Sequence, residues 1–144
     1  MNMSPRIIGL GSKELTQIAS FTAEGRKIYA SYSKSVEGPV NFENLDRAFK
    51  AWAEDKSAKK ADNEDVANGF GCLFGELLKA EFGFGWQQIE DQYGVEKALV
   101  DEKTGSVVFP VNSVWKRIEP KLDTTPFFKP MRDAIKQHLD SLKD

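Results

Sequence analysis

The segment 83–117 constrains the fold most, because its hydrophobic periodicity changes twice within a short stretch. Apolar residues follow helical spacing up to Gly83, change to strand spacing at 83–86, and return to helical spacing at 110–112. Between these points, two turn signals separate three strand-like runs at 86–91, 95–102 and 106–109. This pattern predicts an antiparallel meander of about three strands.

Helical spacing on both sides of the meander predicts four to five helices, and therefore an α+β fold in which the helices pack against the sheet. Most of the expected helices begin at a residue that is favourable as an N-cap. The first two expected helices are about 13–32, with Ser12 as its N-cap, and a helix after the N-cap Asn41, whose apolar stripe is Leu45, Ala48, Phe49 and Trp52. The third is 63–82, capped by Asp62 or Asn63, and the fourth is 114–119, capped by Asn112 or Ser113. The last runs from Thr125–Pro126 to the C-terminus.

Three glycines inside the expected helix 63–82 predict a close packing contact. Gly69, Gly71 and Gly75 each weaken a helix by about 1 kcal/mol relative to alanine. A helix that keeps all three needs space against that face for another backbone or a large aromatic ring. Gly25 interrupts the first expected helix, where a kink or break is the alternative to a straight helix.

The length and composition are those of one globular domain. The 144 residues are 40% hydrophobic and 29% charged, which is ordinary for a folded protein. We expect a single domain spanning 1–144, in which 1–60 form a helical extension. Residues 62–144 then form a core of one helix, three strands and two helices.

Charge and hydropathy exclude two classes of partner. The chain has 20 basic and 22 acidic residues, a net charge of -2, without the clustered positive charge that nucleic-acid binding needs. No apolar run approaches the ~18 residues that span a bilayer, and the N-terminal apolar stretch is too short for a signal peptide. We expect a cytoplasmic protein that binds neither nucleic acid nor membrane.

No group of side chains in the sequence indicates catalysis, a metal or a cofactor. His138 is the only histidine, and Cys72 lies on an apolar helix face, which is typical of a buried, inert thiol. The run 69–75 departs from the dinucleotide-binding motif because its third glycine comes one residue late. The acidic residues between 90 and 102 lie at strand ends and turns, as solvated carboxylates do. The sequence predicts a protein that is not an enzyme.

Five residues at the rim of the meander predict a binding surface. They are Tyr93 in the first turn, and Asn112, Trp115, Lys116 and Arg117 in the short helix that follows the sheet. Exposed aromatic side chains beside arginine have the composition of interface hot spots. We therefore expect this rim to bind another protein or a second copy of the chain.

The order of motifs across about 64–140 resembles a bacterial family catalogued as domain of unknown function 3806. The motifs are Phe74-Gly75-Glu76-Leu77-Leu78, Gly85-Trp86, Tyr93-Gly94, Val108-Phe109-Pro110-Val111 and Lys116-Arg117-Ile118. The resemblance implies a helix, a Trp-initiated strand, a hairpin and a second helix, in that order. It implies no activity and no catalytic residues.

We predict a non-enzymatic protein-binding module of a bacterial cell, comparable in size and architecture to immunity and adaptor proteins. The alternative is a small-molecule-binding protein or weak hydrolase with a pocket between the helix 63–82 and the sheet. A deep pocket lined by Glu76, Trp86 and carboxylates with shifted pKa favours the alternative. A flat face with exposed aromatic side chains favours the binding module.

Overall fold

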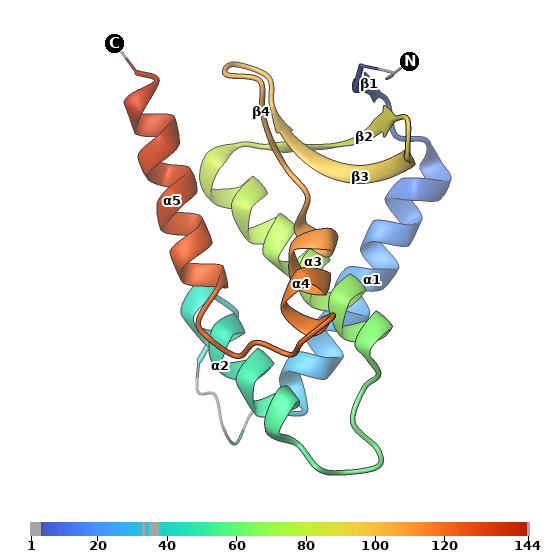
Figure 1. Ribbon diagram of the computed structural model, residues 1–144, viewed down its shortest axis with the longest axis vertical. Coiled ribbons are helices and arrows are strands. Elements are labelled where there is room, and N and C mark those ends of the chain that lie inside the picture. The colour runs from blue at the N-terminus through green and yellow to red at the C-terminus, as the bar shows by residue number, and fades with distance from the viewer. Residues whose placement is uncertain (1–3, 33, 35–37, 144) are drawn as a thin grey trace.

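The computed structural model describes residues 4–32, 34 and 38–143, and within these ranges it contains five helices and four strands (Figure 1). The α+β class is confirmed. None of the helices in these ranges is long and apolar enough to cross a membrane. The elements are β1 (Arg6–Ile8), α1 (Ser12–Ala30), α2 (Phe42–Glu54), α3 (Asn63–Phe82), β2 (Gly85–Asp91), β3 (Gly94–Asp101), β4 (Ser106–Val108), α4 (Pro110–Ile118) and α5 (Phe128–Ser141).

The strands form one antiparallel sheet in the order β1-β2-β3-β4, one strand more than the meander of about three. Strands β2, β3 and β4 are the predicted meander, and Gly105 in its second turn has a φ of 75°. The additional strand β1 pairs Ile7 with Ile89 of β2. Periodicity missed β1 because a three-residue run carries no detectable alternation, and its partner lies more than eighty residues away.

The two faces of the sheet have different surroundings. Directly paired residues of antiparallel strands point to the same face, so Trp86, Leu99 and Val108 share one face and belong to the main hydrophobic core. In Figure 1, α1, α3 and α4 lie below the sheet and β3 bows towards them. The opposite face, which we call the outer sheet face, carries the side chains of Ile7, Ile89, Ala98, Val100, Val107 and Phe109.

The glycines of α3 lie where neighbouring segments approach most closely, as the sequence predicts. A Cβ at Gly69 would lie 2.7 Å from the Cα of Gly25 in α1, so the two helices cross backbone to backbone. A Cβ at Gly71 would lie 2.6 Å from the Cα of Val111 in α4, and one at Gly75 would overlap the ring of Trp86. Helix α1 runs unbroken through Gly25, so this glycine serves the crossing and marks no break.

The observed helix starts agree with the sequence prediction where the N-cap residue directly precedes its helix. Asn41 accepts a hydrogen bond from the N–H of Asn44, and Asp62 accepts one from the N–H of Asp65. Ser12 was the wrong N-cap, since it is the first residue of α1 and Gly11 holds the cap position.

The expected start of the short helix at 114 was also wrong. Helix α4 begins at Pro110, after Phe109 in the cap position, and Asn112 and Ser113 lie in its first turn. Proline is favourable there because the first turn of a helix needs no N–H from it.

Helix α5 begins at Phe128 and not at Thr125–Pro126, because its cap comes from another helix. The carboxylate of Asp46 in α2 accepts hydrogen bonds from the backbone N–H groups of Phe127 (2.6 Å), Phe128 (2.7 Å) and Lys129 (3.0 Å). These donors have no partner within their own helix. The fully buried ring of Phe128 packs edge-on against Phe74 in the core, so one turn fastens α5 to both α2 and α3.

Candidate functional site

The structure places the five residues of the predicted rim in two regions. Tyr93 lies in the turn between β2 and β3, where 88% of its side chain is exposed. Asn112, Trp115, Lys116 and Arg117 lie on α4, and among these only Lys116 is fully exposed. The link between the regions is electrostatic: burial and Asp91 raise the pKa of Glu96 in β3, and the positive charge of Lys116 partly offsets this rise.

Arg117 and Trp115 serve the fold. The Arg117 Nη2 donates a hydrogen bond to the carbonyl of Thr125 (3.1 Å) and forms an ion pair with Asp123 (3.1 Å). Its guanidinium lies 5.2 Å from the ring centre of Phe127. Trp115 is half-buried against the main core. Arg117 therefore fixes the connection between α4 and α5, Trp115 packs on the core, and Lys116 remains as the exposed cation of this helix.

The outer sheet face has a small hydrophobic cluster of its own. Ile89, Ala98 and Val100 are buried, and Phe109 packs against them, in a cluster separate from the main core. No helix side chain of the described residues belongs to this cluster, and no helix lies above this face in Figure 1. At its two edges Ile7 and Val107 are 55% and 40% exposed. The centre of the face is therefore buried, and its exposed apolar side chains are Ile7 and Val107 at the two edges.

A cavity of about 300 Å³ lies at the corner of this face, beside the turn between β2 and β3. We call it the corner cavity, and it is lined by Ile89, Asp91, Tyr93, Gly94, Val95, Glu96 and Phe109. Burial raises the pKa of Glu96, and the neighbouring carboxylate of Asp91 raises it further. The cavity therefore combines two carboxylates with aromatic and aliphatic walls.

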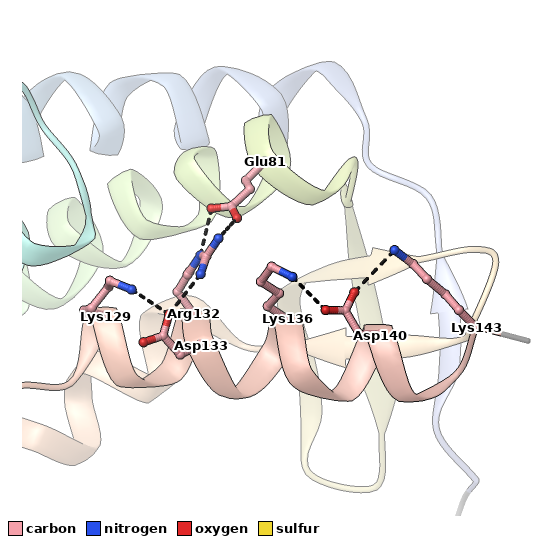
Figure 2. A network of polar contacts seen from close by, with 7 residues as sticks. All are labelled: Glu81, Lys129, Arg132, Asp133, Lys136, Asp140 and Lys143. Carbon is pink, nitrogen blue, oxygen red and sulfur yellow. Dashed lines mark hydrogen bonds and ion pairs between the residues drawn. The ribbon is translucent and has the colours of Figure 1, made fainter.

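A larger hollow of about 670 Å³ separates the C-terminal half of α5 from the end of α3 and the hairpin between β3 and β4. Figure 2 shows ion pairs of Glu81, Lys136, Asp140 and Lys143, four of the charged residues at this hollow. Arg132 donates to both carboxylate oxygens of Glu81, and the ammonium groups of Lys136 and Lys143 both contact Asp140. Because Glu81, Lys136, Asp140 and Lys143 are already in ion pairs, we interpret the hollow as a structural contact region that positions α5.

Part of this network was readable from the sequence. Lys136 and Asp140 have the i,i+4 spacing of ion pairs on one helix face, as do Lys129 and Asp133. The pair between Arg132 and Glu81 joins two helices far apart in the chain, and no local spacing indicates it.

The pocket expected between the helix 63–82 and the sheet is largely filled. The ring of Trp86 occupies the space over Gly75, and its Nε1 donates a hydrogen bond to Glu76 Oε2 (2.8 Å). A remaining cavity of about 370 Å³ lies against α1 and α3, and Glu76 is its single carboxylate. This arrangement lacks the group of carboxylates that an acid–base site needs.

Metal-binding and nucleophilic groups are not brought together in the described part of the chain. No three histidine, cysteine or acidic residues of this part are placed to hold a metal ion. The Cys72 side chain is fully buried, and burial raises its pKa to about 12, so that the reactive thiolate is strongly disfavoured.

Comparison with known proteins agrees with this fold. A crystal structure of a protein from Bacteroides thetaiotaomicron VPI-5482, at 1.50 Å resolution, is similar to the chain with a TM-score of 0.67 and 12% identity. The match covers 96% of this chain and 49% of the other, so the chain spans about half the length of that protein. At this identity the likeness shows the fold alone.

No curated protein matches the sequence. Residues 45–128 match the family model described as Domain of unknown function (DUF3806), which confirms the resemblance carried by the motifs. The match begins earlier than the expected position 64, and so includes most of α2, and it ends at the first residue of α5. The chain therefore belongs to the DUF3806 family.

Proposed function

We propose that this chain is a non-catalytic protein-binding module that contacts its partner through the outer sheet face. The observation that carries the proposal is the exposure of Ile7 and Val107 at the edges of the separate apolar cluster on this face. Sheets with one solvated face ordinarily carry polar residues on it. Here that face carries Ile7, Ile89, Val107 and Phe109 in addition to the polar residues Gln87, Asp91 and Glu96.

The borders of the face support the same function. Tyr93 stands at one corner with 88% of its side chain exposed, and tyrosine is enriched at protein interfaces because it offers a large ring with a polar tip. Lys116 supplies an exposed charge close to the same corner. Tyr93 and Lys116 are thus the members of the predicted rim that are free to meet a partner, and Asn112, Trp115 and Arg117 support them from α4.

We propose a role like that of an adaptor or immunity protein, acting in the bacterial cytoplasm on another protein or on a second copy of the chain. The near-neutral net charge of -2 supports a protein partner over a nucleic acid. No three histidine, cysteine or acidic residues of the described part are placed to hold a metal ion, and the Cys72 thiol is buried, which supports binding over metal- or thiol-dependent catalysis.

The test compares two arginine substitutions at sites of equal exposure. Val107→Arg places a charge on the outer sheet face, and Leu122→Arg places one in the connection between α4 and α5; each wild-type side chain is 40% exposed. A partner captured by the full-length wild-type chain is purified, and its affinity for both variants is measured by calorimetry. Sedimentation velocity of the chain alone measures self-association in parallel.

We expect Val107→Arg to weaken binding or self-association at least about tenfold, which corresponds to about 1.4 kcal/mol. Leu122→Arg is expected to bind like the wild type. Equal affinities for the two variants, or a wild-type chain that binds no protein and stays monomeric at every concentration, would refute the proposal.

A further inference from the structure

The corner cavity is lined by two carboxylates, Asp91 and Glu96, that form no ion pair with another described residue. In the register of β2 and β3, Asp91 pairs with Gly94 and Ile89 pairs with Glu96, so Asp91 and Glu96 are diagonal neighbours on the outer sheet face. Neither carboxylate takes part in an ion pair among residues 4–32, 34 and 38–143. Asp91 Oδ1 accepts a hydrogen bond from the N–H of Tyr93 (2.8 Å), which leaves Oδ2 available.

The two carboxylates stabilise a cation more than either would alone. Burial raises the pKa of Glu96, and the negative charge of Asp91 adds to this rise. Lys116 lowers the same pKa, but it reaches Glu96 only through a longer-range field and forms no ion pair with it. A second cation between Asp91 and Glu96 would relieve their mutual repulsion and pair with both charges.

The walls of the cavity suit a cation that carries an apolar stem. The rings of Tyr93 and Phe109 line it, and a cation over an aromatic face gains further attraction. Ile89, which pairs directly with Glu96, offers aliphatic surface against which the methylene groups of arginine or lysine can pack. The space is open at Gly94, where an added Cβ would meet no atom within 4 Å.

We propose that the corner cavity binds one basic side chain, preferentially an arginine, that the protein partner presents to the outer sheet face. The inference rests on the proposed function, because it names the group by which that partner is recognised. Arginine suits the site better than lysine, since its planar guanidinium donates to two carboxylates at once and stacks on aromatic rings.

The test uses two small probes of the same shape and different charge, with the full chain. N-acetyl-arginine amide and N-acetyl-citrulline amide are titrated into the isotopically labelled protein, and backbone amide shifts are followed by NMR. We expect the arginine probe to shift the amides of 91–96 with saturation, and the citrulline probe to bind roughly tenfold more weakly or not at all, because it lacks the charge.

Two double variants with the same change of net charge distinguish binding in the corner cavity from a general electrostatic effect of the protein surface. Asp91→Asn with Glu96→Gln removes both cavity charges and keeps the side-chain shapes. Glu102→Gln with Glu119→Gln removes two exposed acids elsewhere. We expect only the first pair to abolish the arginine-dependent shifts. Equal effects of arginine and citrulline, or shifts that persist in the first double variant, overturn the inference.

The partner from the preceding experiment distinguishes this inference from the proposed function. If Val107→Arg weakens partner binding and the Asp91/Glu96 double variant does not, the outer sheet face binds the partner and the basic-side-chain inference is wrong. If both variants weaken binding and the Glu102/Glu119 pair does not, both statements stand. If neither variant weakens binding, both fail.

Discussion

The crossing of α1 and α3 gives a sharp prediction, because a single methyl group has no space there. A Cβ at Gly25 would lie 2.6 Å from the carbonyl carbon and 2.9 Å from the Cα of Gly69. Ordinary contacts between carbon atoms are about 3.5–4.0 Å. Both neighbours are backbone atoms that no side-chain rotation can move, so Gly25→Ala must push the helices apart by about 1 Å.

The magnitude follows from two opposing effects. Moving α1 and α3 apart by about 1 Å removes a quarter to a half of the dispersion energy across the crossing. Overpacking of a close-packed interior costs about 1–3 kcal/mol in total. The value belongs at the upper end, about 3 kcal/mol, because the collision is between two backbones. Alanine regains about 1 kcal/mol through its higher helix propensity. The expected net loss in the free energy of unfolding is about 2 kcal/mol for Gly25→Ala.

Urea denaturation followed by circular dichroism measures this loss. With a slope of about 2 kcal/mol per molar urea, the midpoint should fall by about 1 M. Gly85→Ala is the matched control, because its Cβ would meet no atom within 4 Å and its φ is not positive. If Gly25→Ala is as stable as the wild type, or more stable as helix propensity alone would make it, the proposed backbone contact is wrong.

Two further predictions concern the cap of α5 and the buried thiol. Asp46→Ala removes the acceptor of three backbone N–H groups and should lower stability by about 1–2 kcal/mol, while hydrogen exchange accelerates at 128–131; unchanged exchange would contradict the role of the cap. The Cys72 thiol, fully buried with a pKa of about 12, should not react with Ellman's reagent at pH 8 until urea unfolds the chain. Immediate reaction of the native protein would show that the thiol is accessible.

The sequence predicted those parts of the fold that local patterns encode. The glycines of α3 indicated close approach because glycine inside a helix is unfavourable without a packing reason, and the contact of Gly69 with Gly25 confirms it. The start of α5 could not be predicted, since its cap is a carboxylate more than eighty residues earlier in the chain. Local spacing carries no information about such partners.

The sequence likewise predicted those features of the candidate site that depend on local patterns and missed those that depend on distant contacts. The exposure of Tyr93 follows from its place in a turn, which the Tyr-Gly pair indicates. Arg117 bonds to Asp123 and Thr125 because the connection to α5 folds back onto α4. Composition carries no information about this fold, so the sequence predicted a more exposed Arg117 side chain than the structure has. The outer sheet face was missed because only the register of the strands shows that Ile89, Ala98 and Val100 share one face and form a cluster separate from the main core.

The carboxylate of Asp46 joins the two ends of the segment that matches the family model, in addition to capping α5. The matched segment runs from 45 to 128, and this side chain, at its second position, bonds to the backbone of its final residue, Phe128. The segment is therefore a ring closed by hydrogen bonds, with β1 and α1 attached before the closure and the remainder of α5 after it. Residues added to either extension would leave this closure intact, because its two ends already lie side by side. Helix α1 itself cannot be exchanged freely, since it crosses α3 backbone to backbone.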